Sequence, residues 1–316
     1  MKNKSILITG GNGFIGSHLA KRLLTEGNTV YLILRKSSDL WRLQEIANHT
    51  SLIIQYSDLL DIRSIENCIR VARPQIVYHC ATKGASHWQN NPEEILKVNI
   101  LGTLYLLQAC EQLSLEAFIN IGSSSEYGFS SSSMKEDQVL HPNSYYAVAK
   151  ACQSLLCEFI AKSTQKNIIT ARLFTVFGPF EEPTKFFPSL FKAVLHSKPF
   201  KLAAPNLNHD YIYIDHVIDY LQRLPYLNID PSGIYNIGSG KETTLQSIVK
   251  TVENITAQPV IAEWNRYPQH RWDSFRWVAN MDKTHTLLQQ KKSYRLQSDI
   301  KKYWDWYLKH SYLYEK

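Results

Sequence analysis

The chain has 316 residues, 44% of them hydrophobic and 20% charged, a composition that excludes a disordered protein and predicts one long or two unequal globular domains. The net charge of +7 permits an anionic partner, but the Lys and Arg residues form no compact run with interleaved aromatic residues, which argues against nucleic-acid binding. Five cysteines without CxxC spacing indicate reduced thiols in the cytoplasm, and we expect no membrane association because no apolar run could span a bilayer and no signal-peptide pattern opens the chain.

The first elements predicted are a strand, a glycine-rich loop and a helix. Residues 5–9 form an apolar run, residues 10–16 read GGNGFIG, and residues 17–24 follow as an amphipathic helix. In this setting Gly10 allows a tight turn, Gly13 lets the backbone approach a pyrophosphate, and Gly16 lets the helix pack closely. We favour a dinucleotide-binding loop over a purely structural turn. Its candidate cofactor contacts are Gly10, Asn12, Gly13, Phe14, Ile15 and Gly16.

The second strand, residues 29–34, ends in a basic turn. An NAD-preferring site usually has an acidic residue there for the ribose 2′-hydroxyl, but this chain has Arg35, Lys36 and Ser37. These side chains could hold a 2′-phosphate, so the sequence favours NADP(H), with NAD(H) possible. The alternative is a solvated Arg-Lys turn.

Further strands and helices alternate along the first half of the chain. A strand at residues 52–55 leads to Asp58 and Leu59, and a helix at 62–72 precedes a strand at 75–80. This alternation predicts the α/β class, with a doubly wound parallel Rossmann sheet whose ligand lies at the carboxyl ends of the strands.

Two segments are then expected to contribute polar groups to that sheet edge. A long apolar helix at residues 92–113 contains Asn99, which is either a functional residue or a core Asn satisfied by the backbone. A strand at residues 117–121 leads into GSSSEYG, residues 122–128, and residues 130–133 are expected to form a flexible serine loop.

A helix after Pro142 carries Tyr146 and Lys150, which are four residues apart and therefore share one helix face. An ammonium nearby favours the phenolate and lowers the pKa of a Tyr, so Tyr146 could move a proton to or from a hydroxyl or carbonyl. The alternative is a surface pair at helical spacing. We favour the chemical interpretation because the glycine loop and the serine cluster are expected at the same sheet edge.

The composition changes after a strand at residues 168–174. We expect residues 1–174 to form the cofactor domain and residues 175–316 mainly a smaller, mixed substrate domain, with strand-like residues 210–215 and 233–238 returning to the sheet or its rim. Residues 264–277, rich in Trp, Arg and His, suit either a charged planar ligand or a packed aromatic lid. No internal repeat and no metal-ligand spacing is found.

In combination, these motifs resemble the extended short-chain dehydrogenase/reductase family, in the branch that acts on nucleotide sugars. The likeness covers nearly the whole chain and includes TGGNGFIGSHL at residues 9–19, the SYYAVAK segment at 144–150, and YNIGSG at 235–240. The resemblance implies that Tyr146 is the acid/base, that Lys150 lowers its pKa and holds the nicotinamide ribose, and that Ser123 hydrogen-bonds the reacting oxygen, with Ser124 as the alternative. It also implies cofactor contacts from Asp58, Leu59, Ala81 and Asn99.

Departures from the family pattern concern the substrate. Dehydratases of the family usually have acidic residues where this chain has Ser124 and Ser125, so dehydration is disfavoured; Glu126 lies in a different register. The usual diphosphate contacts are replaced by Thr175 and His209, and Arg266 or Arg271 could supply the missing charge. The candidate substrate contacts are Ser124, Thr175, His209 and Arg271.

Because NADP(H) suits net reduction and dehydration is disfavoured, the expected reaction is reduction of a nucleoside-diphosphate 4-keto-6-deoxyhexose at C4. The similarity of GSSSEYG to the GSSEEYG of GDP-4-keto-6-deoxymannose reductases adds to this expectation. The first alternative is a nucleotide-sugar 4-epimerase with bound NAD(P), and the second is a cofactor-sensing binding protein. The resemblance further implies a homodimer formed through the helices near residues 92–113 and 144–162.

Overall fold

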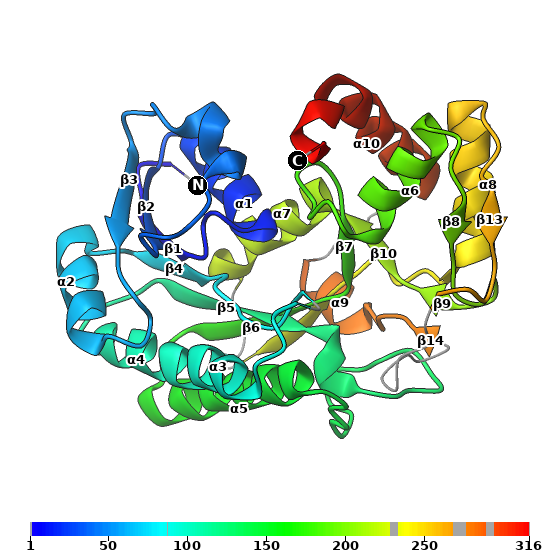
Figure 1. The fold of residues 1–316 in the computed structure, drawn as a ribbon. Coiled ribbons are helices and arrows are strands. Elements are labelled where there is room, and N and C mark those ends of the chain that lie inside the picture. The colour runs from blue at the N-terminus through cyan, green and yellow to red at the C-terminus, as the bar shows by residue number, and fades with distance from the viewer. Residues whose placement is uncertain (1, 87, 228–232, 268–275, 289–293, 316) are drawn as a thin grey trace. The chain divides into compact units, whose positions relative to one another are not determined.

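The computed structural model describes residues 2–315 except 87, 228–232, 268–275 and 289–293 (Figure 1). The chain forms two compact units. The first comprises Met1–Gly128, Val139–Leu173 and Ile218–Tyr235, and the second comprises Phe129–Gln138, Phe174–Val217 and Asn236–Lys316.

A seven-stranded sheet with the order β11-β6-β5-β4-β1-β2-β3 organises the first unit. Its strands are β1 (Ser5–Thr9), β2 (Thr29–Leu34), β3 (Leu52–Tyr56), β4 (Ile76–His79), β5 (Ala117–Ser123), β6 (Ile168–Leu173) and β11 (Ile234–Ile237). Strands β1 to β6 pair in parallel. The strand order reverses between β1 and β4, and in such sheets ligands bind beyond the carboxyl ends of the strands at that point. The predicted α/β fold with a doubly wound parallel sheet is confirmed.

Helices cover both faces of this sheet (Figure 1). On one face lie α1 (Phe14–Thr25) and α7 (Ile214–Arg223), and on the other α2 (Ile62–Ala72), α4 (Gly102–Ala109) and α5 (Tyr145–Thr164). The core between the sheet and α2, α4 and α5 includes Leu7, Val77 and Phe118 from strands, packed with Ile69 and Leu106 from helices. These apolar faces recur at helical and strand periodicities, which is why the sequence predicts the elements well.

The helix predicted at residues 92–113 is interrupted, and this prediction was wrong in detail. The segment consists of α3 (Pro92–Leu96), a π-helical turn (Lys97–Leu101) and α4, which ends at Ala109. A π-helical turn accommodates an extra residue within a helix and is frequent at functional sites. Asn99 lies in this turn and is fully buried.

The described residues of the second unit form three small sheets. Strand β7 (Thr175–Phe177) pairs with β10 (Tyr211–Tyr213), β8 (Phe200–Lys201) pairs with β13 (Ala262–Glu263), and β9 (Asn208–His209) lies between β12 (Thr243–Thr244) and β14 (Arg276–Trp277). Its helices are α6 (Phe186–Leu195), α8 (Leu245–Thr256), α9 (Asp282–Leu288) and α10 (Leu296–His310). Of the two strand-like segments expected to return to the sheet or its rim, the one at 233–238 supplies β11, whereas 210–215 supplies β10 and the start of α7.

A buried carboxylate organises one edge of the second unit. Asp210 accepts hydrogen bonds from the backbone N–H groups of Ser239 (2.7 Å), Gly240 (2.8 Å) and Ala279 (3.2 Å). Burial raises the pKa of Asp210, although these hydrogen bonds oppose the rise. Asp210 therefore fixes the glycine turn after β11 rather than remaining free to contact a ligand.

Short 3₁₀ helices occur at Trp41–Ile46, Ser124–Tyr127, Leu224–Tyr226 and Ser311–Tyr314. None of the helices that the structure describes is both long enough and apolar enough to cross a bilayer.

Candidate active site

The glycine loop after β1 is packed so closely against neighbouring backbone that it leaves no room for side chains at Gly10 and Gly16. Gly10 has a φ of +66°, and a Cβ atom there would lie 2.6 Å from the backbone nitrogen of Ala81. A Cβ atom on Gly16 would lie 2.4 Å from the carbonyl oxygen of Gly10, so this glycine seats the helix against the loop. Helix α1 begins at Phe14, three residues earlier than predicted, and its N-cap Gly13 makes no side-chain capping bond. The close backbone approach and the uncapped N–H groups of the first turn fit a dinucleotide pyrophosphate.

The basic turn after β2 is exposed, and two hydrogen bonds between its first and last residues stabilise it. The N–H of Arg35 donates to Ser38 Oγ (3.2 Å), and the N–H of Ser38 donates to the carbonyl oxygen of Arg35 (3.0 Å). Arg35, Lys36 and Ser37 are all exposed. The Asn12 side chain donates to the carbonyl oxygen of Asp39 (3.1 Å) and so ties the glycine loop to the segment that follows this turn.

The segments after β3 and β4 line the same edge of the sheet. Asp58 is exposed, and its Oδ1 accepts from the N–H of Leu60 (2.9 Å), whereas Leu59 is buried. Leu59 packs against α4, where a Cβ atom on Gly102 would lie 3.1 Å from its Cβ atom. Of the predicted pair, only Asp58 therefore presents an exposed side chain.

Asn99 holds the loop that follows β4. Its Oδ1 accepts from Thr82 Oγ1 (3.1 Å) and from the N–H of Lys83 (3.0 Å), and its Nδ2 donates to the carbonyl oxygen of Lys83 (2.8 Å). Asn99 is a core residue whose amide is satisfied largely by the backbone of Lys83, and it also holds the side chain of Thr82.

Three hydroxyl groups meet at the start of α5. The Tyr146 side chain, which is half-buried, forms hydrogen bonds with the side chains of Ser123 and Thr82. Ser123 ends β5 and caps the following 3₁₀ helix, and Ser144 caps α5 by accepting from the N–H of Ala147 (3.1 Å). The parallel sheet brings together groups that are separated by more than twenty residues of sequence.

The neighbouring serines occupy different environments. Ser123 Oγ also contacts Ser125 Oγ, whereas Ser124 is buried within the 3₁₀ helix. The hydrogen bond to Tyr146 therefore supports Ser123, rather than Ser124, as the hydroxyl beside the reacting oxygen.

The pKa of Tyr146 shifts in the direction opposite to the one expected from the sequence. Burial raises this pKa, Glu126 raises it further, and the hydrogen bonds with Ser123 and Thr82 oppose the rise. Lys150 does not contribute the expected lowering of this pKa, and the desolvation of the phenolate outweighs the effect of the two hydrogen bonds.

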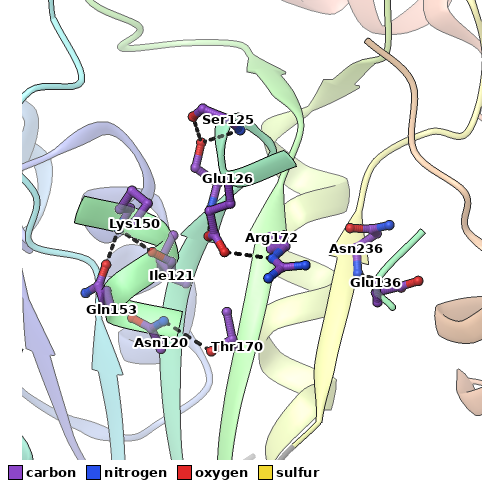
Figure 2. A network of polar contacts seen from close by, with 11 residues as sticks. Asn120, Ile121, Ser125, Glu126, Glu136, Lys150, Gln153, Thr170, Arg172 and Asn236 are labelled. Atoms are coloured by element: carbon purple, nitrogen blue, oxygen red, sulfur yellow. Dashed lines mark hydrogen bonds and ion pairs between the residues drawn. The ribbon is translucent and has the colours of Figure 1, made fainter. Parts of the chain in front are cut away.

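Lys150 lies one turn further along α5, with a side chain that is only 2% exposed. Its Nζ donates to the carbonyl oxygen of Ile121 (2.6 Å) and to Gln153 Oε1 (2.7 Å), as Figure 2 shows. Burial lowers the pKa of Lys150 to about 8, although Glu126 opposes this shift. The ammonium is therefore easier to deprotonate than an ordinary Lys.

Glu126 forms a buried ion pair instead of facing a substrate. Its Oε2 accepts from Arg172 Nε (2.7 Å), its Oε1 accepts from the N–H of Ser123 (2.8 Å), and it is fully buried (Figure 2). The Arg172 guanidinium lies 4.6 Å from the centre of the Tyr127 ring. Glu126 is thus committed to holding Ser123 in place.

The remaining predicted substrate residues lie in the second unit. Thr175 is half-buried in β7, and His209 is half-buried in β9 with its ring centroid 5.9 Å from that of Tyr211. Arg271 lies outside the described residues, and Arg266 is exposed. Within the described ranges, no three His, Cys, Asp or Glu side chains are grouped so that they could hold a metal ion.

The sequence interpretation did not single out Thr82 or Gln153. A signal for Thr82 was available, because it lies three residues after the end of β4 and the carboxyl ends of parallel strands share one sheet edge. For Gln153 the only signal was its spacing of three residues from Lys150, which places both side chains on neighbouring positions of one helix.

Comparisons with known proteins agree with this geometry. Residues 6–238 match the model of the NAD dependent epimerase/dehydratase family. The chain is 26% identical over 312 residues to a UDP-glucuronate 4-epimerase of Thermodesulfobacterium geofontis, covering 95% of both proteins, and 29% identical over 276 residues to a dTDP-D-glucose 4,6-dehydratase of Dictyostelium discoideum, covering 80% of this chain and 62% of that protein. It is also similar to the crystal structure of a UDP-glucuronic acid 4-epimerase of Bacillus cereus in complex with UDP-glucuronic acid and NAD, with a TM-score of 0.87, 26% identity and coverage of 98% of this chain and 99% of that one.

Proposed function

The chain belongs to the NAD dependent epimerase/dehydratase family, and from this premise we propose that it is a 4-epimerase of a nucleoside-diphosphate hexose that keeps NAD(P) bound. The observation that carries the proposal is that Tyr146 contacts two hydroxyl groups, while Glu126, the carboxylate whose charge acts on Tyr146, is ion-paired with Arg172. One acid/base group suits a reaction that removes and returns a proton at one hydroxyl.

In the proposed reaction Tyr146 takes the proton from the 4-hydroxyl as a hydride leaves C4, and later returns a proton to the same oxygen. A nicotinamide cofactor bound at this site would supply the hydride acceptor and donor. Ser123 and Thr82 hydrogen-bond the phenol, Ser123 also steadies the reacting oxygen, and Lys150 would hold the nicotinamide ribose. No electron or proton is gained or lost overall.

Dehydration is the less favoured reaction in this family for this chain. Elimination of water requires a further acid/base carboxylate near the sugar, and the positions expected to supply it are Ser124 and Ser125. Glu126 is unsuitable because its two oxygens accept from Arg172 and from the backbone of Ser123. Support from relatives points the same way, since two of the proteins compared above are named as 4-epimerases.

Reduction of a nucleoside-diphosphate 4-keto-6-deoxyhexose is the second candidate. The specific observation in its favour is the exposed turn of Arg35, Lys36 and Ser37 after β2, which suits the 2′-phosphate of NADP(H). It ranks below epimerisation because the Bacillus cereus relative contains NAD and no relative compared here is named as a reductase.

The test incubates the purified protein with UDP-linked hexoses and hexuronates, and separately with nucleotide-linked 4-keto-6-deoxyhexoses and NADPH. We expect interconversion of a pair of 4-epimers with no net consumption of cofactor. Stoichiometric loss of NADPH with a 4-keto substrate would instead establish the reductase. Release of water from the hexose, detected as a mass loss in the product, would establish a dehydratase.

A further inference from the structure

A chain of buried hydrogen bonds runs from Lys150 into the core of the first unit. Gln153 Oε1 accepts from the ammonium, and Gln153 Nε2 donates to Thr103 Oγ1 (2.8 Å). His79 Nε2 also lies 2.8 Å from Thr103 Oγ1, and Gln153, Thr103 and His79 are all fully buried. Buried groups of this kind must pair their donors and acceptors, so the direction of each bond can be assigned.

The assignment begins at Thr103. Its hydroxyl donates to the carbonyl oxygen of Asn99 (2.6 Å), which uses its one proton. Both other contacts to Thr103 Oγ1 must therefore be donors, so His79 carries its proton on Nε2 and Gln153 presents its NH₂ group. Burial lowers the pKa of His79 to about 3, so the ring is neutral and holds one proton.

The far end of the chain agrees with this assignment. Since His79 Nδ1 bears no proton, it accepts from the hydroxyl of Thr9 (2.7 Å). Thr9 Oγ1 in turn accepts from the backbone N–H of Ala81 (3.2 Å), beside the glycine loop. Each hydrogen bond in the series from Ala81 to Gln153 thus has a defined donor and a defined acceptor.

These constraints fix the amide of Gln153 in one orientation. A flipped amide would bring its NH₂ group against the ammonium of Lys150 and its oxygen against a Thr103 hydroxyl whose proton is committed elsewhere. Lys150 has three N–H donors, and two of them reach Ile121 and Gln153. Among the residues that the structure describes, no acceptor is hydrogen-bonded to the third.

We propose that Gln153 is a positioning residue for Lys150: its carbonyl oxygen, oriented by Thr103, aims the third N–H of the ammonium at the cofactor ribose without adding a charge. This inference rests on the role of Lys150 in the proposed function. A carboxylate in the same place would also hold the ammonium, but it would stabilise the charged form and keep Lys150 protonated to higher pH.

The charge of Lys150 depends on few neighbours. Glu126 from the 3₁₀ helix, Cys157 from α5 and Cys80 from the end of β4 all raise its pKa, whereas burial lowers it more strongly, to about 8. A Lys whose pKa is lowered is charged below that pKa and loses its charge as the pH rises through it. Cofactor affinity should therefore fall above about pH 8, and a negative charge introduced at residue 153 should raise the midpoint of that loss.

The experiment measures the affinity for NAD+ and for NADP+ without sugar, by quenching of tryptophan fluorescence, between pH 6 and 10. We expect Gln153→Met to weaken binding roughly five- to tenfold at pH 7, as loss of one hydrogen bond to a charged group predicts. We expect Gln153→Glu to retain binding and to move the alkaline midpoint upward by about one pH unit. Gln108→Glu, an exposed substitution on α4, should leave both quantities unchanged.

A second pair of variants, at Thr103, tests the proposal even if the substitutions at position 153 prevent folding. Thr103→Ser keeps the hydroxyl and should bind like the parent protein, whereas Thr103→Val removes it and should bind like Gln153→Met. Variants that melt like the parent and bind with unchanged affinity and midpoint would overturn the inference, as would a parent protein that binds neither nucleotide. Because no sugar is present, failure of the 4-epimerase reaction would be a separate result.

Discussion

Removing the carboxylate of Glu126 should destabilise the first unit more than any surface change. Glu126→Gln preserves the shape of the side chain and can still accept from the N–H of Ser123, but it leaves the Arg172 guanidinium, only 2% exposed, without its negative partner. Breaking a buried ion pair on one side costs about 3–5 kcal/mol. Set against a typical unfolding free energy of about 5–15 kcal/mol, this loss removes a large share of the stability.

Urea unfolding followed by tryptophan fluorescence gives the assay, with Glu158→Gln as the matched control. Glu158 pairs with Lys162 at 2.6 Å on the exposed side of α5, so its replacement should cost less than about 1 kcal/mol. The double variant Glu126→Gln with Arg172→Met should be more stable than Glu126→Gln alone, because it also removes the buried charge.

Two results would refute this reasoning. The first is a Glu126→Gln protein whose unfolding free energy lies within about 1 kcal/mol of the parent, as for a surface pair. The second is a double variant less stable than Glu126→Gln. A catalytic consequence follows as well, since Glu126 raises the pKa of Lys150 and its removal should shift the alkaline loss of cofactor binding to lower pH.

Three further predictions concern chemistry, cofactor and assembly. Tyr146→Phe should lower kcat about 10²- to 10⁴-fold while nucleotide affinity is retained; unchanged turnover would exclude Tyr146 as the acid/base. Arg35→Asp should weaken NADP(H) binding by about 1.5–3 kcal/mol with little effect on NAD(H) binding. The control Arg63→Asp on α2 should leave the affinity for both nucleotides unchanged, and equal losses for both nucleotides in Arg35→Asp would contradict a 2′-phosphate contact. We propose a homodimer formed through α5, where the Phe159 side chain is 68% exposed. Phe159→Glu should therefore give a monomeric mass by light scattering, whereas Val71→Glu, at a site on α2 that is 60% exposed, should leave the dimer intact. A monomeric parent protein would count against the proposed dimer.

The sheet and the glycine loop could be predicted from sequence because their signals are local. Strands β1 and β2 are apolar runs bounded by turn residues, and Gly10 and Gly16 stand where only a hydrogen atom fits. The grouping of Ser123 with the glycine loop follows from one rule, that parallel strands end at a common edge. For these features, short stretches of sequence carry the information.

Other features depend on contacts that no local pattern encodes. The pairing of Glu126 with Arg172 joins residues 46 positions apart, and the pKa of Tyr146 follows burial that the spacing to Lys150 does not report. The preference for NADP(H) over NAD(H) rested on a single exposed turn and remains part of a proposal. The small strands of the second unit are two or three residues long, too short to leave a periodic pattern.

The π-helical turn at Lys97–Leu101 determines how α4, the helix that follows it, is rotated about its axis. Each residue of an α-helix advances about 100° around the axis, so the extra residue turns α4 by that angle relative to an unbroken helix. Deleting one residue within the turn would give a smoother helix but would rotate Thr103 away from His79 and Gln153. A change that improves local geometry would therefore unlink Lys150 from the core, and insertions or deletions here should be tolerated far less well than substitutions.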